Sequence, residues 1–246
     1  MPGALGALVV VAIQSLNFQT AADATVEVQR TRARLLLDGA LQVELERMLM
    51  GIAPEQVHRR QVPSPDGTGS TITFSVSFED GKIDVNAGPT PLLRDALRAG
   101  GADADSISEM LATVTSVRQR QGAFADARQI LPLSLRLAPG SDKIVRFLTT
   151  SSRTQSFNPR LAEPELLGDL QALPDAVRAR VIALGRNEPT AGPPPAPGPW
   201  QGWLGSARDT IKLAATLQGT GGLSMARSVV FRIDRNRQRL NLLRSL

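Results

Sequence analysis

Few side chains in this sequence have the types and spacing that covalent or acid–base chemistry needs. The chain has 246 residues, no Cys and one His, which excludes cysteine nucleophiles, thiolate zinc sites, disulfides and multi-histidine metal centres. His58 stands beside Arg59 and Arg60, and no nucleophile accompanies it. Phosphate-cradle, HExxH and GxSxG motifs are absent. The sequence therefore predicts a protein that is not an enzyme and has no catalytic residues.

An acidic cluster at Asp103, Asp105 and Glu109 has a spacing that could suggest calcium. A calcium-binding loop needs a central Gly and a late Glu, and position 114 is Val. Ser106 and Glu109 instead fit a capping box, in which the two side chains bond the backbone at the start of a helix. We therefore expect a helix to begin here, and we assign no metal ligand.

Two short leucine-containing segments between residues 157 and 186 have the form of a helix-hairpin-helix unit. Pro164 opens the first segment and Pro174 opens the second, with Leu173-Pro174 as the joint. DNA-binding units of this type carry hairpin glycines whose N–H groups cradle a phosphate. Here Asp175 follows Pro174, and its carboxylate would repel an anion. The sequence predicts no nucleic-acid partner, and a helix-hairpin-helix nucleic-acid-binding protein is the alternative function.

The positive charge of the chain is local. Lys and Arg number 28 against 23 Asp and Glu, which gives a net charge of +5. Residues 224–246 hold six arginines and one aspartate, so the remainder of the chain is balanced. These arginines are typical of a solvated strand edge that resists edge-to-edge pairing. Contact with lipid headgroups or an acidic partner is the other interpretation.

The first 50 residues favour one long helix that begins apolar and becomes amphipathic. Gly3–Ile13 carries no charge, and no proline occurs between Pro2 and Pro54. An apolar start that extends to residue 18 spans about 24 Å, which is shorter than the ~30 Å hydrocarbon core of a bilayer. The apolar residues of this start are Leu5, Leu8, Val9, Val10, Val11, Ile13, Leu16 and Phe18.

Alternating apolar residues predict a small antiparallel sheet. Thr71–Phe78 alternates Ile, Phe and Val with Thr and Ser, and Lys82–Asn86 follows after a turn, so the two segments predict a hairpin. Thr210–Gln218 and Ser228–Asp234 predict a second, C-terminal hairpin.

Helical signals occupy the region between these strands, and Thr90 followed by Pro91 marks one helix start. Six prolines within Asn187–Gln201 predict an extended linker. We expect an α+β protein with a long helix at 1–50, the start of a sheet at 51–86, a helical domain at 87–187, a Pro-rich linker at 188–207 and C-terminal strands at 208–246.

Two short motifs, in this order of elements, carry a resemblance to a known family. Gly81, Ile83, Asp84 and Asn86 match a Gly-Arg/Lys-Ile-Asn/Asp-Leu/Val-Asn strand. A later run at residues 158–162 keeps the first Asn and the Ala of an Asn-x-Asn-Thr-Ala-Pro motif that precedes a helix pair. The matching residues of this run are Asn158 and Ala162, and Leu173 and Pro174 follow at the joint of the helix pair. With the apolar leading helix, these motifs resemble the K minor pseudopilin of type II secretion systems, the general secretion pathway protein K family.

The resemblance implies a pilin-like fold: a long N-terminal helix, a small antiparallel sheet and a helical domain inserted between strands that contains the helix-hairpin-helix-like pair. It implies a structural subunit at the tip of the pseudopilus that supports protein export across the outer membrane. Its partners would be the I and J minor pseudopilins.

The apolar residues of the first 18 positions would hold the subunit in the bacterial inner membrane by a single pass, with its domain in the periplasm. They would later pack against neighbouring helices in the fibre. Most pilin-like proteins carry Glu at the fifth mature residue, but the K family does not. If Gly3 ends a leader, Leu8 is that residue here. The family is associated with calcium, but no ligand motif matches this sequence, so no cofactor site is assigned.

Overall fold

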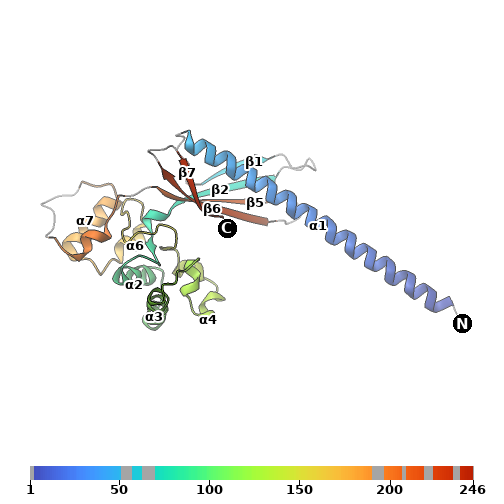
Figure 1. The fold of residues 1–246 in the computed structure, drawn as a ribbon, viewed down its shortest axis with the longest axis horizontal. Coiled ribbons are helices and arrows are strands. Elements are labelled where there is room, and N and C mark those ends of the chain that lie inside the picture. The colour runs from blue at the N-terminus through green and yellow to red at the C-terminus, as the bar shows by residue number, and fades with distance from the viewer. Residues whose placement is uncertain are drawn as a thin grey trace. The chain divides into compact units, whose positions relative to one another are not determined.

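The computed structural model describes residues 3–50, 57–62, 70–189, 197–206, 209–218, 224–234 and 239–245 (Figure 1). In the first helix, side chains are described at residue 24 and from residue 26 onward. The protein is α+β, as expected. It forms two compact units, which are Met1–Val76 with Leu213–Val229 and Ser245–Leu246, and Ser77–Lys212 with Val230–Arg244.

The first helix, α1, covers Gly3–Leu49 without a break, so the predicted N-terminal helix is confirmed (Figure 1). Its 47 residues extend for about 70 Å at a rise of about 1.5 Å per residue. Ala33, Leu37 and Leu41 are buried at helical spacing and define one inward face. Asp38 on α1 accepts a hydrogen bond from Arg227 Nε at 3.2 Å, which ties the helix to strand β6.

Among the described side chains, no helix is long and apolar enough to cross a membrane. The apolar residues expected between positions 5 and 18 lie on the helical backbone of α1, and their side chains fall outside the described set.

Five strands form a sheet in the order β1-β2-β5-β6-β7. Their bounds are Val57–Val62, Ser70–Phe78, Thr210–Gln218, Ser224–Asp234 and Arg239–Ser245. β1 and β2 are antiparallel, with Val57 opposite Ser75 and Val62 opposite Ser70. The predicted strand at Thr71–Phe78 is confirmed, and its alternation places Ile72, Phe74 and Val76 in the core.

The C-terminal strands also agree with the prediction, because β5 and β6 are neighbours in the sheet. A third strand, β7, follows at the sheet edge and was not predicted individually. β5 alternates like β2, with Ile211, Leu213, Ala215 and Leu217 buried. β2 and β5 are adjacent although the helices α2–α7 lie between them in the sequence.

The predicted hairpin between Thr71–Phe78 and Lys82–Asn86 is wrong. A 3-10 helix at Glu79–Gly81 follows β2, and the next strand, β3 (Ile83–Asp84), pairs in parallel with β4 (Leu148–Thr149) in a separate sheet. The physical reason is burial. Ile83 and Val85 enter the apolar core of the second unit, so their backbone N–H groups find partners there, on Phe147 O and Thr149 O.

The second unit contains the remaining helices. These are α2 (Thr90–Ala99), α3 (Ala104–Gln119), a 3-10 helix at Ala127–Ile130, α4 (Leu133–Arg136), α5 (Ser141–Ile144), α6 (Pro164–Gly168), α7 (Asp175–Gly185) and a 3-10 helix at Pro199–Trp203. α2 begins where Thr90 and Pro91 predict it, and α6 and α7 begin at or just after the predicted prolines. α2 packs on α3 and α6, and α6 packs on α7.

The predicted capping box at Ser106 and Glu109 is wrong, because α3 and its N-cap begin three residues earlier. Asp103 is the N-cap, and its Oδ1 and Oδ2 accept hydrogen bonds from Ser106 N and Ser106 Oγ, both at 2.8 Å. These two bonds lower the pKa of Asp103, since they favour the charged carboxylate. Aspartate is as good an N-cap as serine, so the local pattern at Ser106 and Glu109 could not by itself place the start of the helix.

Candidate functional site

The two sequence motifs meet in space, although almost 80 positions separate them. Gly81, in the first motif, lies against the backbone of the second. A Cβ atom at Gly81 would overlap the carbonyl group of Leu161 and crowd Ala162 N. Glycine is therefore required here by close backbone approach. In addition, Asn158 N donates to Asp80 O at 2.6 Å.

Asp80 extends this junction to the start of β5. Its buried Oδ2 accepts hydrogen bonds from Asp209 N at 2.8 Å and from Thr210 N at 2.7 Å. One carboxylate thus accepts hydrogen bonds from two consecutive backbone N–H groups. Residue 80 lies in the segment expected to be a turn after Thr71–Phe78. A buried acid between a strand and a glycine has no local signal that distinguishes it from a surface turn.

Asp84, the carboxylate of the first motif, accepts four hydrogen bonds. Its Oδ1 accepts from Asn86 N at 2.7 Å and Ala87 N at 3.0 Å, and its Oδ2 accepts from Ser152 Oγ at 3.0 Å and Arg153 N at 2.8 Å. The residue is 2% exposed. Four hydrogen bonds occupy the lone pairs of both oxygens, so Asp84 joins two chain segments and has no capacity left for a ligand.

Asn86 completes the motif by a reciprocal pair of bonds with Phe124. Its Nδ2 donates to Phe124 O at 3.0 Å, and Phe124 N donates to its Oδ1 at 2.7 Å. Arg118 reaches the same turn from α3 and donates to Val85 O and Gly88 O, each at 2.7 Å. Burial lowers the pKa of Arg118, and the charge of Asp84 partly offsets this.

The second motif is also structural. Asn158 is buried, and its Oδ1 accepts from Arg160 N at 3.0 Å, while Ala162 packs against the core of the second unit. Leu173 is buried at the joint between α6 and α7, and Pro174 is the exposed N-cap of α7. All eight predicted motif residues therefore lie in one unit, where all except Pro174 connect segments that are distant in sequence or pack in its core.

Another carboxylate, Asp95 on α2, holds the joint between α6 and α7. Its Oδ2 accepts from Ala172 N at 2.7 Å, and its Oδ1 accepts from Arg98 Nη1 at 3.0 Å. Burial raises the pKa of Asp95, although the Ala172 hydrogen bond and the Arg98 charge oppose the shift. The joint between α6 and α7 is thus anchored to α2 by its backbone.

The described residues contain no group of three or more His, Cys, Asp or Glu side chains that could hold a metal ion. Asp103 caps α3, and Asp105 and Glu109 are exposed on that helix. The buried carboxylates at positions 80, 84 and 95 instead accept hydrogen bonds from backbone or side-chain donors. Their role is to satisfy donors that the fold would otherwise bury without partners.

The described part of α1 carries an exposed apolar surface, which we call the outer stripe and define by Val28, Leu35, Val43 and Leu49. Their side chains are 50%, 66%, 40% and 44% exposed. Steps of seven residues from position 28 to 35 and of fourteen from 35 to 49 keep Val28, Leu35 and Leu49 on one side of the helix, and Val43 flanks them at about 80° from Leu35. Leu37 lies about 160° away from Leu35 at about 100° per residue, so the stripe is roughly opposite the buried face.

A comparison of the sequence with protein-family models and with curated proteins gave no match.

Proposed function

We propose that this chain is a structural assembly protein, a K-type minor pseudopilin at the tip of the type II secretion pseudopilus. In this role it supports protein export across the outer membrane. The proposal includes a pilin-like fold, a single pass of the N-terminal helix through the bacterial inner membrane and a periplasmic domain. The observation that carries it is the outer stripe on a helix of 47 residues.

The outer stripe supports assembly because isolated exposed apolar residues are normal on a surface, but a line of them at heptad spacing is typical of helix–helix contact. α1 already buries a separate face that includes Leu37 and Leu41. The outer stripe and the buried face therefore occupy different sides of the same helix, although Val26, which is 45% exposed, lies on the side of Leu37. A bundle of such helices is the arrangement that a pseudopilus needs.

The order of elements supports the pilin-like fold and the inserted helical domain. A long helix is followed by β1 and β2, then by α2–α7, and only then by β5, which is the sheet neighbour of β2. A helical segment placed between two adjacent strands in this way supports the proposed insertion. α6 and α7 pack on each other within it and form the helix-hairpin-helix-like pair.

The meeting of the two motifs supports the family assignment. Each motif is short, but Gly81 and Asn158 make their structural contacts on each other's segments. Two motifs that depend on each other in space are a stronger resemblance than two unrelated matches.

Co-purification with I-type and J-type minor pseudopilins from detergent extracts tests the proposal. We expect a complex with the full chain and at least a ten-fold lower yield with the double variant Leu35→Glu and Leu49→Glu, because charges on the outer stripe would be desolvated at a helix interface. Gln29→Glu is the matched control, since residue 29 is exposed on α1 but lies outside the outer stripe.

No complex with the unmodified chain, or equal yields for all variants, would contradict the assembly role. The alternative function is tested on the same preparation with duplex DNA. Binding that weakens steeply with salt would support a nucleic-acid-binding protein instead.

A further inference from the structure

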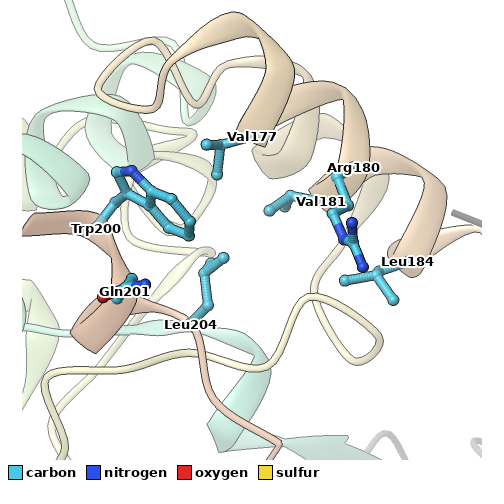
Figure 2. A pocket seen from close by; sticks show the side chains of 7 residues that line it. All are labelled: Val177, Arg180, Val181, Leu184, Trp200, Gln201 and Leu204. Carbon is cyan, nitrogen blue, oxygen red and sulfur yellow. The ribbon is translucent and has the colours of Figure 1, made fainter. Parts of the chain in front are cut away.

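A pocket in the second unit has a lining that the assembly role does not use (Figure 2). Its volume is about 200 Å³, and it lies between α7 and the 3-10 helix at Pro199–Trp203 with the residue that follows. Five of its lining residues are apolar and two are polar: Val177, Val181, Leu184, Trp200, Leu204, Arg180 and Gln201. Helix and 3-10 helix supply opposite walls.

Arg180 is the unusual member of this lining. Its Nη1 atom is buried and has no hydrogen-bond partner. A buried donor without a partner costs about 1–3 kcal/mol, and more when it is charged. By contrast, Arg178, two residues earlier on α7, is bonded to Asp175. The unpartnered Nη1 therefore belongs to a cationic side chain that lines a mainly apolar pocket (Figure 2).

We propose that this pocket binds a monocarboxylate with a small apolar body. Arg180 would pair with the carboxylate, Gln201 would contribute its amide, and Val177, Val181 and Trp200 would enclose the apolar part. This assignment is independent of the proposed assembly function.

The chemistry of the walls selects a carboxylate over other anions. One guanidinium neutralises one negative charge, whereas a phosphate dianion in an apolar pocket would keep an uncompensated charge and a large desolvation cost. The size is also suitable, since an apolar cavity of about 150 Å³ accommodates benzene. The same chemistry is presented by a free aliphatic acid and by the C-terminal residue of a peptide.

The experiment compares hexanoate with hexanamide, which has the same shape and no charge. Binding is followed by the fluorescence of the tryptophans and by the methyl NMR signals of Val177, Val181 and Leu204. We expect saturable binding of hexanoate to the full chain, with a dissociation constant at least ten-fold lower than for hexanamide. An acetylated dipeptide that ends in leucine, against its C-terminal amide, shows whether a peptide end is the better source of the carboxylate.

Two variants assign the effect to the guanidinium. Arg180→Gln is expected to abolish the preference for hexanoate, whereas Arg178→Gln on the same helix is expected to keep it. The comparison of hexanoate with hexanamide on the unmodified chain remains decisive if Arg180→Gln does not fold. Equal affinities for the acid and the amide, no saturable binding of either, or an undiminished preference in Arg180→Gln would each overturn the proposal.

Discussion

The described part of α1 and the helical region of the second unit differ in how much of their apolar surface they bury. α1 buries a narrow face and leaves the outer stripe in solvent, including Leu35 at 66% exposure. The helical region builds a continuous core from α2, α3, α6 and α7, with Leu92, Leu97 and Met110 fully buried. It also buries carboxylates that accept backbone hydrogen bonds, whereas Glu44 is the buried acid on the described part of α1.

This difference shows which region is complete by itself. The helical region covers most of its large apolar residues and satisfies its buried acids internally, although Leu133 and Leu137 near α4 are exposed. α1 has apolar surface that no described residue covers. A helix with one face packed and the opposite face apolar is suited to a second contact, and this is the physical basis of the assembly proposal.

The largest effect is expected from a substitution that disrupts the junction between the two motifs in the helical region. Gly81→Val would force side-chain carbon into the Leu161 carbonyl group, and we expect a loss of about 4 kcal/mol or more in the free energy of unfolding. The matched control is Gly168→Ala, where an added Cβ meets nothing within 4 Å. Urea unfolding followed by circular dichroism measures both. Similar stabilities for the two variants would show that the motifs do not depend on each other.

The next effect tests the buried acids. Asp84→Ala removes the acceptor for four hydrogen bonds and leaves the N–H groups of Asn86, Ala87 and Arg153 without it, so we expect about 3 kcal/mol of destabilisation. Asp142→Ala removes an exposed partner of Arg128 and should cost less than about 1 kcal/mol. Guanidinium unfolding curves of both variants provide the comparison. An Asp84→Ala variant as stable as Asp142→Ala would rule out the connecting role of this carboxylate.

The same substitution at two nearby leucines distinguishes the buried face of α1 from the outer stripe. Leu37→Ala empties a fully buried position and should destabilise the protein by about 2 kcal/mol, while Leu35→Ala on the outer stripe should change stability by less than about 0.5 kcal/mol. Thermal unfolding of the full chain without partners measures both effects. If Leu35→Ala were as costly as Leu37→Ala, the outer stripe would be covered within this chain.

The smallest effect is a dependence on pH that distinguishes a buried acid from a surface cap. Because the pKa of Asp95 is raised on folding, its contribution to stability is present below its unfolded pKa of 3.8 and is lost as the pH rises through the folded pKa. Asp103 has the opposite sign: its contribution is present above 3.8 and is lost as the pH falls through its lowered pKa.

We therefore compare the free energy of unfolding of each variant with that of the unmodified chain between about pH 2 and pH 6, the acid range of carboxylates. As the pH rises, this difference is expected to change in opposite directions for Asp95→Asn and Asp103→Asn. Differential scanning calorimetry at a series of pH values measures the two differences. A common direction for both variants would contradict the burial of Asp95 as the cause of its shift.

Local patterns in the sequence were sufficient for the elements that depend on local physics. The long helix followed from uninterrupted helix-compatible residues, β2 from strict alternation at Ile72, Phe74 and Val76, and the starts of α2, α6 and α7 from proline. The cap of α3 was misplaced because Asp103 and Ser106 both have the chemistry of an N-cap, and a local rule cannot rank them.

Partners that are distant in the chain could not be predicted in the same way. Lys82–Asn86 has strand character, but whether it pairs with the preceding strand or with Leu148–Thr149 depends on which core receives Ile83. The bonds of Asp84 to Ser152 and Arg153, the contact of Gly81 with Leu161 and the unpaired Nη1 of Arg180 are likewise consequences of tertiary packing. Periodicity, proline and composition act over a few residues, so the sequence alone determined elements such as α1, β2 and the starts of α2, α6 and α7. Only the folded chain decided which buried donors, acceptors and apolar faces were matched.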